Sequence, residues 1–497
     1  MKLKDLINLN SNMEHFAQLD IESIQTNSRL CDSKSIFVCI KGYVTDGHKY
    51  IPDAISRGTR VILMQDDGAK PSDTANSTQH QEVLYISLPD TRAALGPLCA
   101  KLYDDPSSKL SLIGITGTKG KTTTSYLVRS IFTSAHINTG LIGTMYNIIG
   151  TKQIPAVRTT PEANEIQPML VQMLEAGSKA CIMEVSSQGL HLSRVGGLRF
   201  NTAIFTNLSR DHIGDNEHAN MEEYAAAKAK LFTMCHNAII NIDNDYAEIM
   251  LDSARKSQLH PEIYTFSTNA DKKADFTAIN IQKHPDNVSY DIINNKQTII
   301  SHIQVPIPGL FTVYNSMCAF IVAYIAGIDL QYIKDGLSNV FVPGKAENVP
   351  TGRDFSVLID YAHNPDSIAN IIDTVKEYAR RTVIVFGCGG DRNRPRALMG
   401  KTAGEHADFT IITSDNPRSE DPESIVRDIE EGIKQTDGKY ICIVDRRKAI
   451  EYAIDNAQPG DVIILAGKGH ETEQIFKDHT VHFDEREVVA QALGKVK

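Results

Sequence analysis

The thirteen residues Leu110-Ser-Leu-Ile-Gly-Ile-Thr-Gly-Thr-Lys-Gly-Lys-Thr122 decide the fold of the central part of this chain. Residues 110–115 are mostly apolar, which is typical of a buried strand. The strand runs into the glycine-rich stretch 117–120, and a helical pattern begins at about residue 122. A strand, a glycine-rich loop and a helix in this order turn backbone N–H groups and the helix N-terminus toward phosphate oxygens. The stretch therefore predicts a phosphate-binding loop in an α/β domain.

Side chains in and beside this loop suggest what it binds. Lys121 can reach the terminal phosphates of a nucleotide, and the Thr122 hydroxyl can bind magnesium. The common spacing has a glycine where this chain has Ile115, so the match is to the variant Gly-Thr-x-Gly-Lys-Thr. Glu184 ends the apolar strand 180–183, where a second magnesium ligand is expected, although a surface acid at a strand end fits that position equally well. The loop predicts nucleotide binding but does not name a reaction.

The composition is that of an ordinary globular protein. The chain has 497 residues, of which 41% are hydrophobic and 23% charged. A chain of this length predicts about three domains. The net charge of -10 disfavours nucleic acid as a partner, because nucleic-acid binders usually carry a basic surplus.

Three observations bear on the compartment. The first residues lack the apolar core of a signal peptide. The longest apolar stretch, near 320–328, has about half the length of a membrane span. The eight cysteines are scattered without a Cys-x-x-Cys pair, which argues against a disulfide framework and a cysteine-rich zinc site. We therefore expect a cytoplasmic protein that binds neither membrane nor nucleic acid.

The order of apolar and polar segments predicts three α/β domains. Residues 1–97 mix short strands and turns and predict a small N-terminal domain. Residues 98–340 carry the phosphate loop in a mostly parallel sheet, with a small antiparallel sheet at 275–307. Residues 341–497 alternate five strands with helices, which predicts a Rossmann-like, doubly wound sheet. Ligands bind at the carboxyl ends of such strands, where this chain has polar clusters at 360–363, 387–392, 415–418 and 467–471.

Further short motifs follow one another along the whole chain. They are Asn27-Ser28-Arg29, Asp46-Gly47, Thr159-Thr160-Pro161-Glu162, Glu184-Val-Ser-Ser187, Asn207-Leu-Ser-Arg-Asp211-His212, Tyr224-x-x-Ala-Lys228, Asp360-Tyr-Ala-His363, Gly387-Cys-Gly-Gly-Asp-Arg392, Asp415-Asn-Pro-Arg418 and Gly467-Lys-Gly-His-Glu471. Together with the phosphate loop, they resemble the Mur ligase family. Within it, they resemble the members that add the third residue of the peptidoglycan stem peptide.

The resemblance implies an ATP-dependent amide ligase of peptidoglycan synthesis, and so a role in cell shape and cell division. ATP would phosphorylate the D-Glu carboxylate of UDP-MurNAc-L-Ala-D-Glu, and the amine of a diamino acid would then displace phosphate from the acyl phosphate. The resemblance assigns the uridine substrate to the first domain, ATP and Mg²⁺ to the second, and the amino acid to the third. We expect a monomer whose partners are these small molecules.

The resemblance also implies roles for individual residues. Lys121, Glu184, His212 and Lys228 would be catalytic, and Thr122, Glu184, His212 and Lys228 would hold magnesium. From the residues alone, a helical lysine such as Lys228 is usually a solvated charge. The resemblance to the family implies instead that Lys228 is carbamylated. The ATP-binding set would be Gly117, Thr118, Lys119, Gly120, Lys121, Thr122, Thr123, Asn315, Lys345 and Asp360. The uridine substrate would contact Ser28, Thr159, Thr160, Ser186 and Arg194. The amino acid would contact Arg392, Asp415, Asn416, Arg418, Gly467 and Glu471.

The identity of the amino acid depends on Arg418. In this family Asp-Asn-Pro-Arg tends to accompany meso-diaminopimelate, whose distal carboxylate an arginine can bind through two parallel hydrogen bonds. L-Lysine ends in an ammonium group, which an arginine would repel. Arg418 therefore favours diaminopimelate, and Glu471 would accept hydrogen bonds from the ammonium group.

Departures from the family pattern leave alternatives open. Lys345 replaces the arginine of Pro-Gly-Arg-x-Glu, Thr312 replaces an asparagine, and 392–396 is about one residue short. The same ligase acting on L-lysine or another diamino acid is the first alternative. A P-loop kinase or ATPase of another pathway would leave the third-domain motifs without a role, and a non-catalytic binding module would not explain Lys121, Thr122 and Glu184. Tyr361 and His363 are either ligand contacts or strand-end packing.

Overall fold

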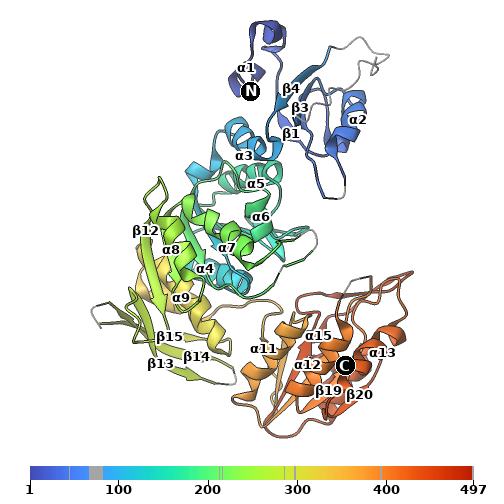
Figure 1. The fold of residues 1–497 in the computed structure, drawn as a ribbon. Helices are drawn as coiled ribbons and strands as arrows, with labels where there is room; N and C mark the ends of the chain where they lie inside the picture. The colour runs from blue at the N-terminus through green and yellow to red at the C-terminus, as the bar shows by residue number, and fades with distance from the viewer. Residues whose placement is uncertain are drawn as a thin grey trace. The chain divides into compact units, whose positions relative to one another are not determined.

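The computed structural model describes residues 1–43, 45–65, 82–211, 213–214, 217–284, 286–295, 298–391 and 394–494. Contacts divide the chain into two compact units, one formed by 1–277 with 318–333 and the other by 278–317 with 334–497. In the described residues, the strands form a four-stranded sheet, an eleven-stranded sheet, a six-stranded sheet and a two-stranded hairpin (Figure 1). The three larger sheets confirm the predicted α/β class, whereas the domain boundaries near 97 and 340 stay a prediction.

The N-terminal sheet has four parallel strands in sequence order (blue in Figure 1). Every residue of the second strand is buried. Since successive side chains of a strand point to opposite sides, both faces of this strand are covered. Ile36 and Val38 belong to one core cluster, and Phe37 and Cys39 to another. The strands are β1 (Ser23–Gln25), β2 (Ser35–Val38), β3 (Val61–Gln65) and β4 (Leu84–Leu88), and the helices are α1 (Leu3–Leu6), α2 (Ile51–Ser56) and α3 (Thr91–Leu102).

The eleven-stranded sheet has the order β15-β14-β13-β12-β11-β10-β5-β9-β6-β7-β8. Strand β5 lies between β10 and β9 and is parallel to both, so the phosphate loop follows a central, buried strand. The strands are β5 (Ser111–Thr116), β6 (Thr139–Ile142), β7 (Tyr146–Ile149), β8 (Lys152–Pro155), β9 (Ala180–Glu184), β10 (Phe200–Phe205), β11 (Cys235–Asn241), β12 (Glu262–Ser267), β13 (Phe276–Lys283), β14 (Val288–Asn294) and β15 (Ile299–Val305).

Helices and antiparallel edges complete this region. Strands β14 and β15 pair antiparallel, as predicted for 275–307, but they extend the edge of the large sheet instead of forming a sheet of their own. At the other edge β7 pairs antiparallel with β6 and β8, which was not predicted. The helices are α4 (Lys121–Ser134), α5 (Ala163–Glu175), α6 (Ser187–His191), α7 (Met221–Ala229), α8 (Ala247–Arg255), α9 (Leu310–Ile325) and α10 (Leu330–Ser338).

The C-terminal sheet confirms the predicted alternation of strands and helices. Its order is β16-β17-β21-β18-β19-β20, with all strands parallel except β16. Strand β21 lies between β17 and β18 and is buried along its length, as expected for a central parallel strand. The strands are β16 (Glu347–Val349), β17 (Ser356–Asp360), β18 (Arg381–Phe386), β19 (Phe409–Ile412), β20 (Tyr440–Cys442) and β21 (Asp461–Ala466).

Five helices and a small hairpin surround this sheet. The predicted helices appear as α11 (Pro365–Lys376), α12 (Arg396–His406), α13 (Pro422–Ile433) and α14 (Arg446–Asp455). The sequence analysis missed α15 (Glu485–Ala492) and the hairpin of β22 (Glu473–Ile475) and β23 (Thr480–His482). Apolar residues of α14 and α15, such as Ile450 and Val488, pack on alternate residues of the strands, such as Val385 and Leu465.

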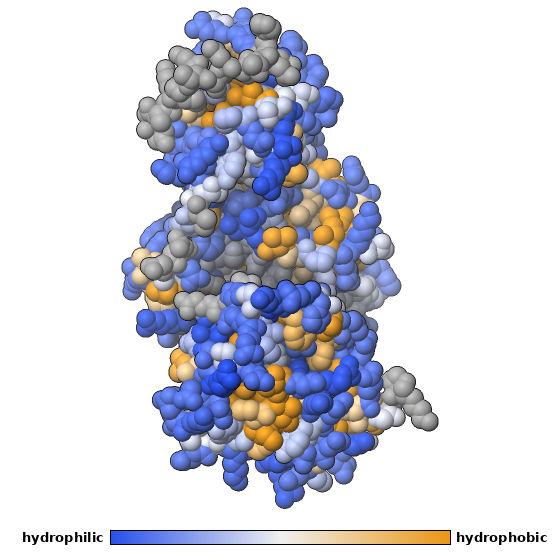
Figure 2. Space-filling view, turned by 90° about the vertical axis from the view of Figure 1, so that its right-hand side faces the viewer, coloured by the Kyte–Doolittle hydropathy of each residue, from blue (hydrophilic) through white to orange (hydrophobic). Residues whose placement is uncertain are grey.

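The surface and the helices add two observations. Figure 2 shows a mainly polar face with apolar side chains in separate patches, which is ordinary for a globular protein. Within the described ranges, none of the helices has the length and apolar character needed to cross a bilayer.

Candidate active site

The loop between β5 and α4 is held in shape by the end of β10. Asn207 Oδ1 accepts a hydrogen bond from the Lys119 backbone N–H at 3.0 Å, and its Nδ2 donates to the Lys119 carbonyl at 3.1 Å. The Asn207 carbonyl accepts from the Thr118 N–H at 2.9 Å. A Cβ at Gly117 would lie 1.9 Å from Thr206 Oγ1, so this close approach requires glycine. The loop is therefore preorganised, and the contribution of Asn207 was not anticipated from the sequence.

Lys121 begins α4 and folds back over the loop. Its Nζ donates to the Gly117 carbonyl at 2.8 Å and to the Thr118 carbonyl at 3.1 Å. The ammonium group thus lies against the loop backbone, and its contact with nucleotide phosphates stays a prediction.

Glu184 ends β9 and is almost completely buried, with 1% of its surface exposed. The Thr122 hydroxyl donates to its Oε2 at 2.9 Å, and Thr144 donates through its hydroxyl to Oε2 at 2.8 Å and through its N–H to Oε1 at 3.1 Å. A Cβ at Gly143 would lie 2.5 Å from Oε1. Thr122 and Glu184 therefore form a pair of hard oxygen donors beside the phosphate loop, and this donor set fits Mg²⁺.

Lys228 lies on α7 but is not a solvated lysine. Only 1% of its surface is exposed, and its Nζ donates to the Gly117 carbonyl at 3.0 Å, the same oxygen that Lys121 approaches. Its Nζ also lies 4.5 Å from the centre of the Tyr224 ring. Burial, reinforced by the positive charge of Lys121 and opposed by Asp211, holds the pKa of Lys228 well below its ordinary value. In contrast, Lys230 is exposed.

Four of the five residues predicted to bind the uridine substrate surround the end of β9. Thr160 donates to the Glu184 carbonyl at 3.0 Å and accepts from the Ser186 N–H at 2.9 Å. Arg194 Nη1 donates to the Thr160 carbonyl at 3.2 Å. Thr159 joins this group through a hydrogen bond of 3.1 Å with Thr144. The fifth, Ser28, is buried at the start of a short helix after β1.

A second cluster of possible metal ligands lies between α6 and α7. One donor atom from each of His191, His218 and Glu223 lies within 4.8 Å of the others. The Nδ1 atoms of His191 and His218 are 3.6 and 4.0 Å from Glu223 Oε1. This cluster was not predicted, because His191 is distant in sequence from His218 and Glu223. His212, predicted as a magnesium ligand, lies outside the described residues.

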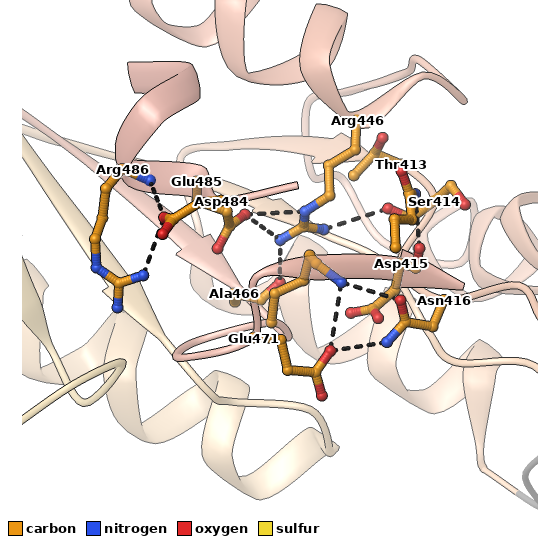
Figure 3. A network of polar contacts seen from close by, with 12 residues as sticks. Thr413, Ser414, Asp415, Asn416, Arg446, Ala466, Glu471, Asp484, Glu485 and Arg486 are labelled. Atoms are coloured by element: carbon orange, nitrogen blue, oxygen red, sulfur yellow. Dashed lines mark hydrogen bonds and ion pairs between the residues drawn. The ribbon is translucent and has the colours of Figure 1, made fainter. Parts of the chain in front are cut away.

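In the C-terminal sheet, four of the six residues predicted to bind the amino acid come together beyond the carboxyl ends of β19 and β21 (Figure 3); they are Asp415, Asn416, Gly467 and Glu471. Asn416 Nδ2 donates to Glu471 Oε2 at 2.8 Å, and a Cβ at Gly467 would lie 2.5 Å from Asp415 Oδ2. The fully buried Lys468 donates to Asn416 Oδ1 at 3.0 Å and lies 3.3 Å from Glu471 Oε2. Lys468 was quoted within its motif but was not assigned a role.

Arg418 follows this cluster in a constrained conformation. Its φ of 51° lies in the left-handed region, which side chains other than glycine rarely adopt. Its backbone N–H donates to the Ile475 carbonyl at 3.0 Å, and its Nη1 donates to the Gly390 carbonyl at 3.2 Å. These bonds fix the guanidinium group of a half-buried side chain. Arg392 and the residue after it lie outside the described residues.

The other predicted nucleotide contacts lie in the second unit. Asp360 ends β17 and accepts from the N–H groups of Ala362 and Ala346, both at 2.8 Å. Lys345 Nζ lies 5.3 Å from the centre of the Tyr361 ring. Asn315 is buried on α9.

Three further positions in this unit complete the sequence-derived set. The hydroxyl of Thr312 donates to the Pro308 carbonyl at 3.1 Å, at the beginning of α9. Tyr361 packs against His363 and His470 beyond the end of β17, with ring centres 4.8 and 5.2 Å apart.

Comparison with known proteins gives a consistent result over the chain. The matching family models are "Mur ligase family, catalytic domain" over 20–103, "Mur ligase middle domain" over 115–323 and "Mur ligase, glutamate ligase domain" over 346–469. A UDP-N-acetylmuramoyl-L-alanyl-D-glutamate--2,6-diaminopimelate ligase of Caldanaerobacter subterraneus is 44% identical over 100% of this chain and 99% of that protein. Its namesake in Clostridium perfringens is 42% identical over 95% of each chain. A solved structure with the same protein name is 28% identical, covers 100% of this chain and 99% of that chain, and has a TM-score of 0.72.

Proposed function

The chain belongs to the Mur ligase family, and from this premise we propose that it is an ATP-dependent amide ligase of the MurE subgroup. It joins meso-diaminopimelate to the D-Glu carboxylate of UDP-MurNAc-L-Ala-D-Glu. The observation that carries this proposal is the convergence of Lys121 and the buried Lys228 on the Gly117 carbonyl, beside the Thr122–Glu184 pair. A nucleotide-binding loop with only a structural role would not need a second, desolvated lysine.

The phosphate loop and its neighbours would act on ATP. The backbone N–H groups of 117–120 and the N-terminus of α4 bind phosphate oxygens, and Lys121 turns from the loop carbonyls to the transferred phosphoryl group. Thr122 and Glu184 would hold Mg²⁺, which neutralises phosphate charge when bound. In the second unit, Asn315, Lys345 and Asp360 complete the proposed ATP-binding set.

The reaction proceeds in two displacements. A D-Glu carboxylate oxygen attacks the γ-phosphorus of ATP, and ADP leaves with the electrons of the broken P–O bond. The amine of the acceptor then attacks the carbonyl carbon of the acyl phosphate, phosphate leaves, and the nitrogen loses a proton. Thr159, Thr160, Ser186 and Arg194 would orient the uridine substrate beside Glu184, with Ser28 holding its nucleotide end. Water must be excluded while the acyl phosphate exists.

The proposed role of Lys228 is that of a carbamate. Its lowered pKa favours the neutral amine, which is the form that adds to CO₂ with release of one proton. The change places a negative charge next to Lys121, where burial and the charge of Lys121 disfavour an ammonium group. The carbamate would join His212 as an oxygen donor for a second Mg²⁺.

Replacement of Lys228 tests this role directly. Lys228→Ala is expected to abolish ligase activity, whereas Lys230→Ala, two residues away on the surface, is expected to retain it. Full activity in Lys228→Ala would contradict the assignment. Both variants should be compared with the native protein by thermal melting, so that loss of the fold is separated from loss of chemistry.

The acceptor would bind at the carboxyl ends of β19 and β21. In this proposal Arg418 and Arg392 would bind the distal carboxylate, and Asp415, Asn416, Gly467 and Glu471 would bind the remainder of the molecule. Glu471 accepts hydrogen bonds from the acceptor's ammonium group. The same ligase with L-lysine as acceptor is the alternative outcome of the assay below.

The remaining sequence expectations enter this proposal unchanged. We place the enzyme in the cytoplasm as a monomer, because its eight cysteines are free thiols and its proposed partners are small molecules. We also keep the three functional regions 1–97, 98–340 and 341–497 for the uridine substrate, ATP and the amino acid.

The test is phosphate release with ATP, Mg²⁺ and UDP-MurNAc-L-Ala-D-Glu. Parallel reactions contain meso-diaminopimelate, L-lysine, L-ornithine or no amine. Release that depends on diaminopimelate is the expected result. Release with lysine alone would retain the ligase and refute the argument from Arg418, and phosphate release insensitive to every amine would favour an ATPase of another pathway.

A further inference from the structure

A buried ion pair lies behind the proposed amino-acid site (Figure 3). Arg446 is the first residue of α14 and Glu485 the first residue of α15, and neither side chain is exposed to solvent. Arg446 Nε and Nη2 donate to Glu485 Oε1 at 2.9 and 2.7 Å. Within the described part of the chain, Glu485 Oε2 is buried without a hydrogen-bond partner. A buried pair with an unsatisfied oxygen is poor evidence for stabilisation, so another role must be considered.

The other N–H groups of Arg446, on Nη2 and Nη1, point to the two loops that carry the acceptor residues. Nη2 donates to the Ala466 carbonyl at 2.9 Å, and Nη1 donates to the Ser414 carbonyl at 3.4 Å. Ala466 is the last residue of β21 and precedes Gly467, while Ser414 directly precedes Asp415. One planar guanidinium group therefore connects the beginnings of these two loops, at the carboxyl ends of β19 and β21. Its N–H directions are fixed, which lysine cannot reproduce.

The proposed acceptor residues depend on the alignment of these loops. Gly467 comes so close to Asp415 that a Cβ there would lie 2.5 Å from the Asp415 carboxylate. One residue further along each loop, Lys468 donates to Asn416 at 3.0 Å, and Asn416 donates in turn to Glu471 at 2.8 Å. A shift of a few tenths of an ångström between the loops would change the direction in which Glu471 and Asn416 face a ligand.

We infer that Arg446, oriented by Glu485, is a positioning residue that sets the spacing of the 414–418 and 466–471 loops for the acceptor amino acid. The inference rests on the proposed function, because that function places the acceptor at these loops. Arg446 is fully buried and does not itself contact the acceptor. Its removal should therefore weaken acceptor binding without changing how the protein handles ATP or the uridine substrate.

The same sheet offers a matched control at the opposite ends of its strands. Arg381 and Asp461 are the first residues of β18 and β21 and are paired in register. Arg381 Nε lies 3.1 and 3.2 Å from the two oxygens of Asp461, whose side chain is 1% exposed. Arg381→Lys therefore disturbs an arginine–carboxylate pair in this sheet far along the strands from the acceptor loops.

The experiment compares Arg446→Lys with Arg381→Lys in the full-length protein. Arg446→Lys keeps a positive charge near Glu485. Its single ammonium group cannot, however, reach the Glu485 carboxylate and the carbonyls of Ala466 and Ser414 together. We expect its KM for meso-diaminopimelate to rise at least tenfold, with the KM values for ATP and UDP-MurNAc-L-Ala-D-Glu within twofold of native. Arg381→Lys should leave all three KM values unchanged. The inference would be overturned if Arg446→Lys keeps the native KM for meso-diaminopimelate, or if all three KM values rise equally.

A second readout keeps this result separate from the fate of the proposed function. Hydrogen–deuterium exchange is expected to be faster in 414–418 and 466–471 of Arg446→Lys and unchanged there in Arg381→Lys. If the native enzyme shows no turnover with any diamino acid, the proposed function fails, and the exchange data still decide whether Arg446 orders the loops. If Arg446→Lys does not fold, Glu485→Gln takes its place and should show the same faster hydrogen–deuterium exchange in 414–418 and 466–471. Exchange in these loops at the native rate would overturn the inference.

Discussion

Replacement of Arg418 by asparagine tests how the enzyme chooses its acceptor. Arg418 adopts a φ of 51°, and asparagine is among the few residues that tolerate this left-handed conformation. The backbone hydrogen bond from residue 418 to the Ile475 carbonyl, 3.0 Å in the native protein, can therefore persist. The substitution removes the guanidinium group with little added strain in the loop.

The magnitude follows from the lost contacts. Two parallel charge-assisted hydrogen bonds to the distal carboxylate of diaminopimelate contribute together about 3 kcal/mol, after a discount for a half-buried group. This loss lowers kcat/KM for diaminopimelate by roughly two orders of magnitude. For L-lysine, removal of a like charge about 6 Å away is worth roughly 1 kcal/mol, which raises kcat/KM about fivefold. The preference should thus shift by nearly three orders of magnitude.

The assay measures kcat/KM for both amino acids by phosphate release at fixed ATP and uridine substrate. Arg427→Asn is the matched control, because Arg427 lies on the nearby helix α13 with 62% of its side chain exposed. The control should keep the native preference. If Arg418→Asn retains its preference for diaminopimelate, or loses activity with both amino acids equally, Arg418 does not bind the distal carboxylate.

Four further outcomes are expected. Because burial and Lys121 lower the pKa of Lys228, carbamylation should persist at neutral pH. Enzyme depleted of CO₂ should lose activity and regain it when bicarbonate is added. Labelled carbonate should give a carbamate signal in ¹³C NMR that is absent in Lys228→Ala. Glu184→Gln should reduce activity at least 100-fold and raise the Mg²⁺ concentration needed, and an unchanged Mg²⁺ dependence would exclude it as a ligand. Gly117→Ala should lose nucleotide binding, measured by calorimetry, since its Cβ would lie 1.9 Å from Thr206 Oγ1. Gly177→Ala also places alanine at a positive φ, here 79°, but with nothing within 4 Å of its Cβ, and should retain nucleotide binding. Burial, together with Lys345 and Arg486, lowers the pKa of His470 to about 4, below its usual value near 6.5. The free energy of unfolding should therefore decrease as the pH falls from about 6.5 to 4. His470→Gln should make the melting temperature depend less on pH over that range, and identical melting profiles of the two proteins would refute the shift.

Local patterns were sufficient for most of the elements that carry the candidate site. The apolar run before Gly117 becomes a buried central strand, and Glu184 ends the neighbouring strand as its position in the sequence indicates. In the C-terminal sheet, the polar clusters at 415–418 and 467–471 meet because parallel strands end at the same edge. The hairpin of β22 and β23 was missed because each strand has only three residues, too few for a clear alternation.

Partnerships between distant residues could not be predicted in the same way. Nothing near Lys228 in the sequence shows that it is buried, and the helical pattern around it fits a solvated lysine equally well. Its burial arises because α7 brings it to the Gly117 carbonyl from 111 residues away. Arg446 and Glu485 likewise form a pair only because the starts of α14 and α15 meet behind two loops.

The amino-acid sequence alone indicates the class of the fold, the phosphate-binding loop and the family. Periodicity, glycine placement and short motifs are local properties, and they can be recognised without the tertiary structure. The tertiary structure alone decides protonation and orientation. A lysine changes its pKa through the water that packing removes and the charges that packing brings near, and an arginine orders two loops only where both carbonyls come within reach of one planar group. These effects depend on distances of a few ångströms between residues that the chain itself keeps far apart.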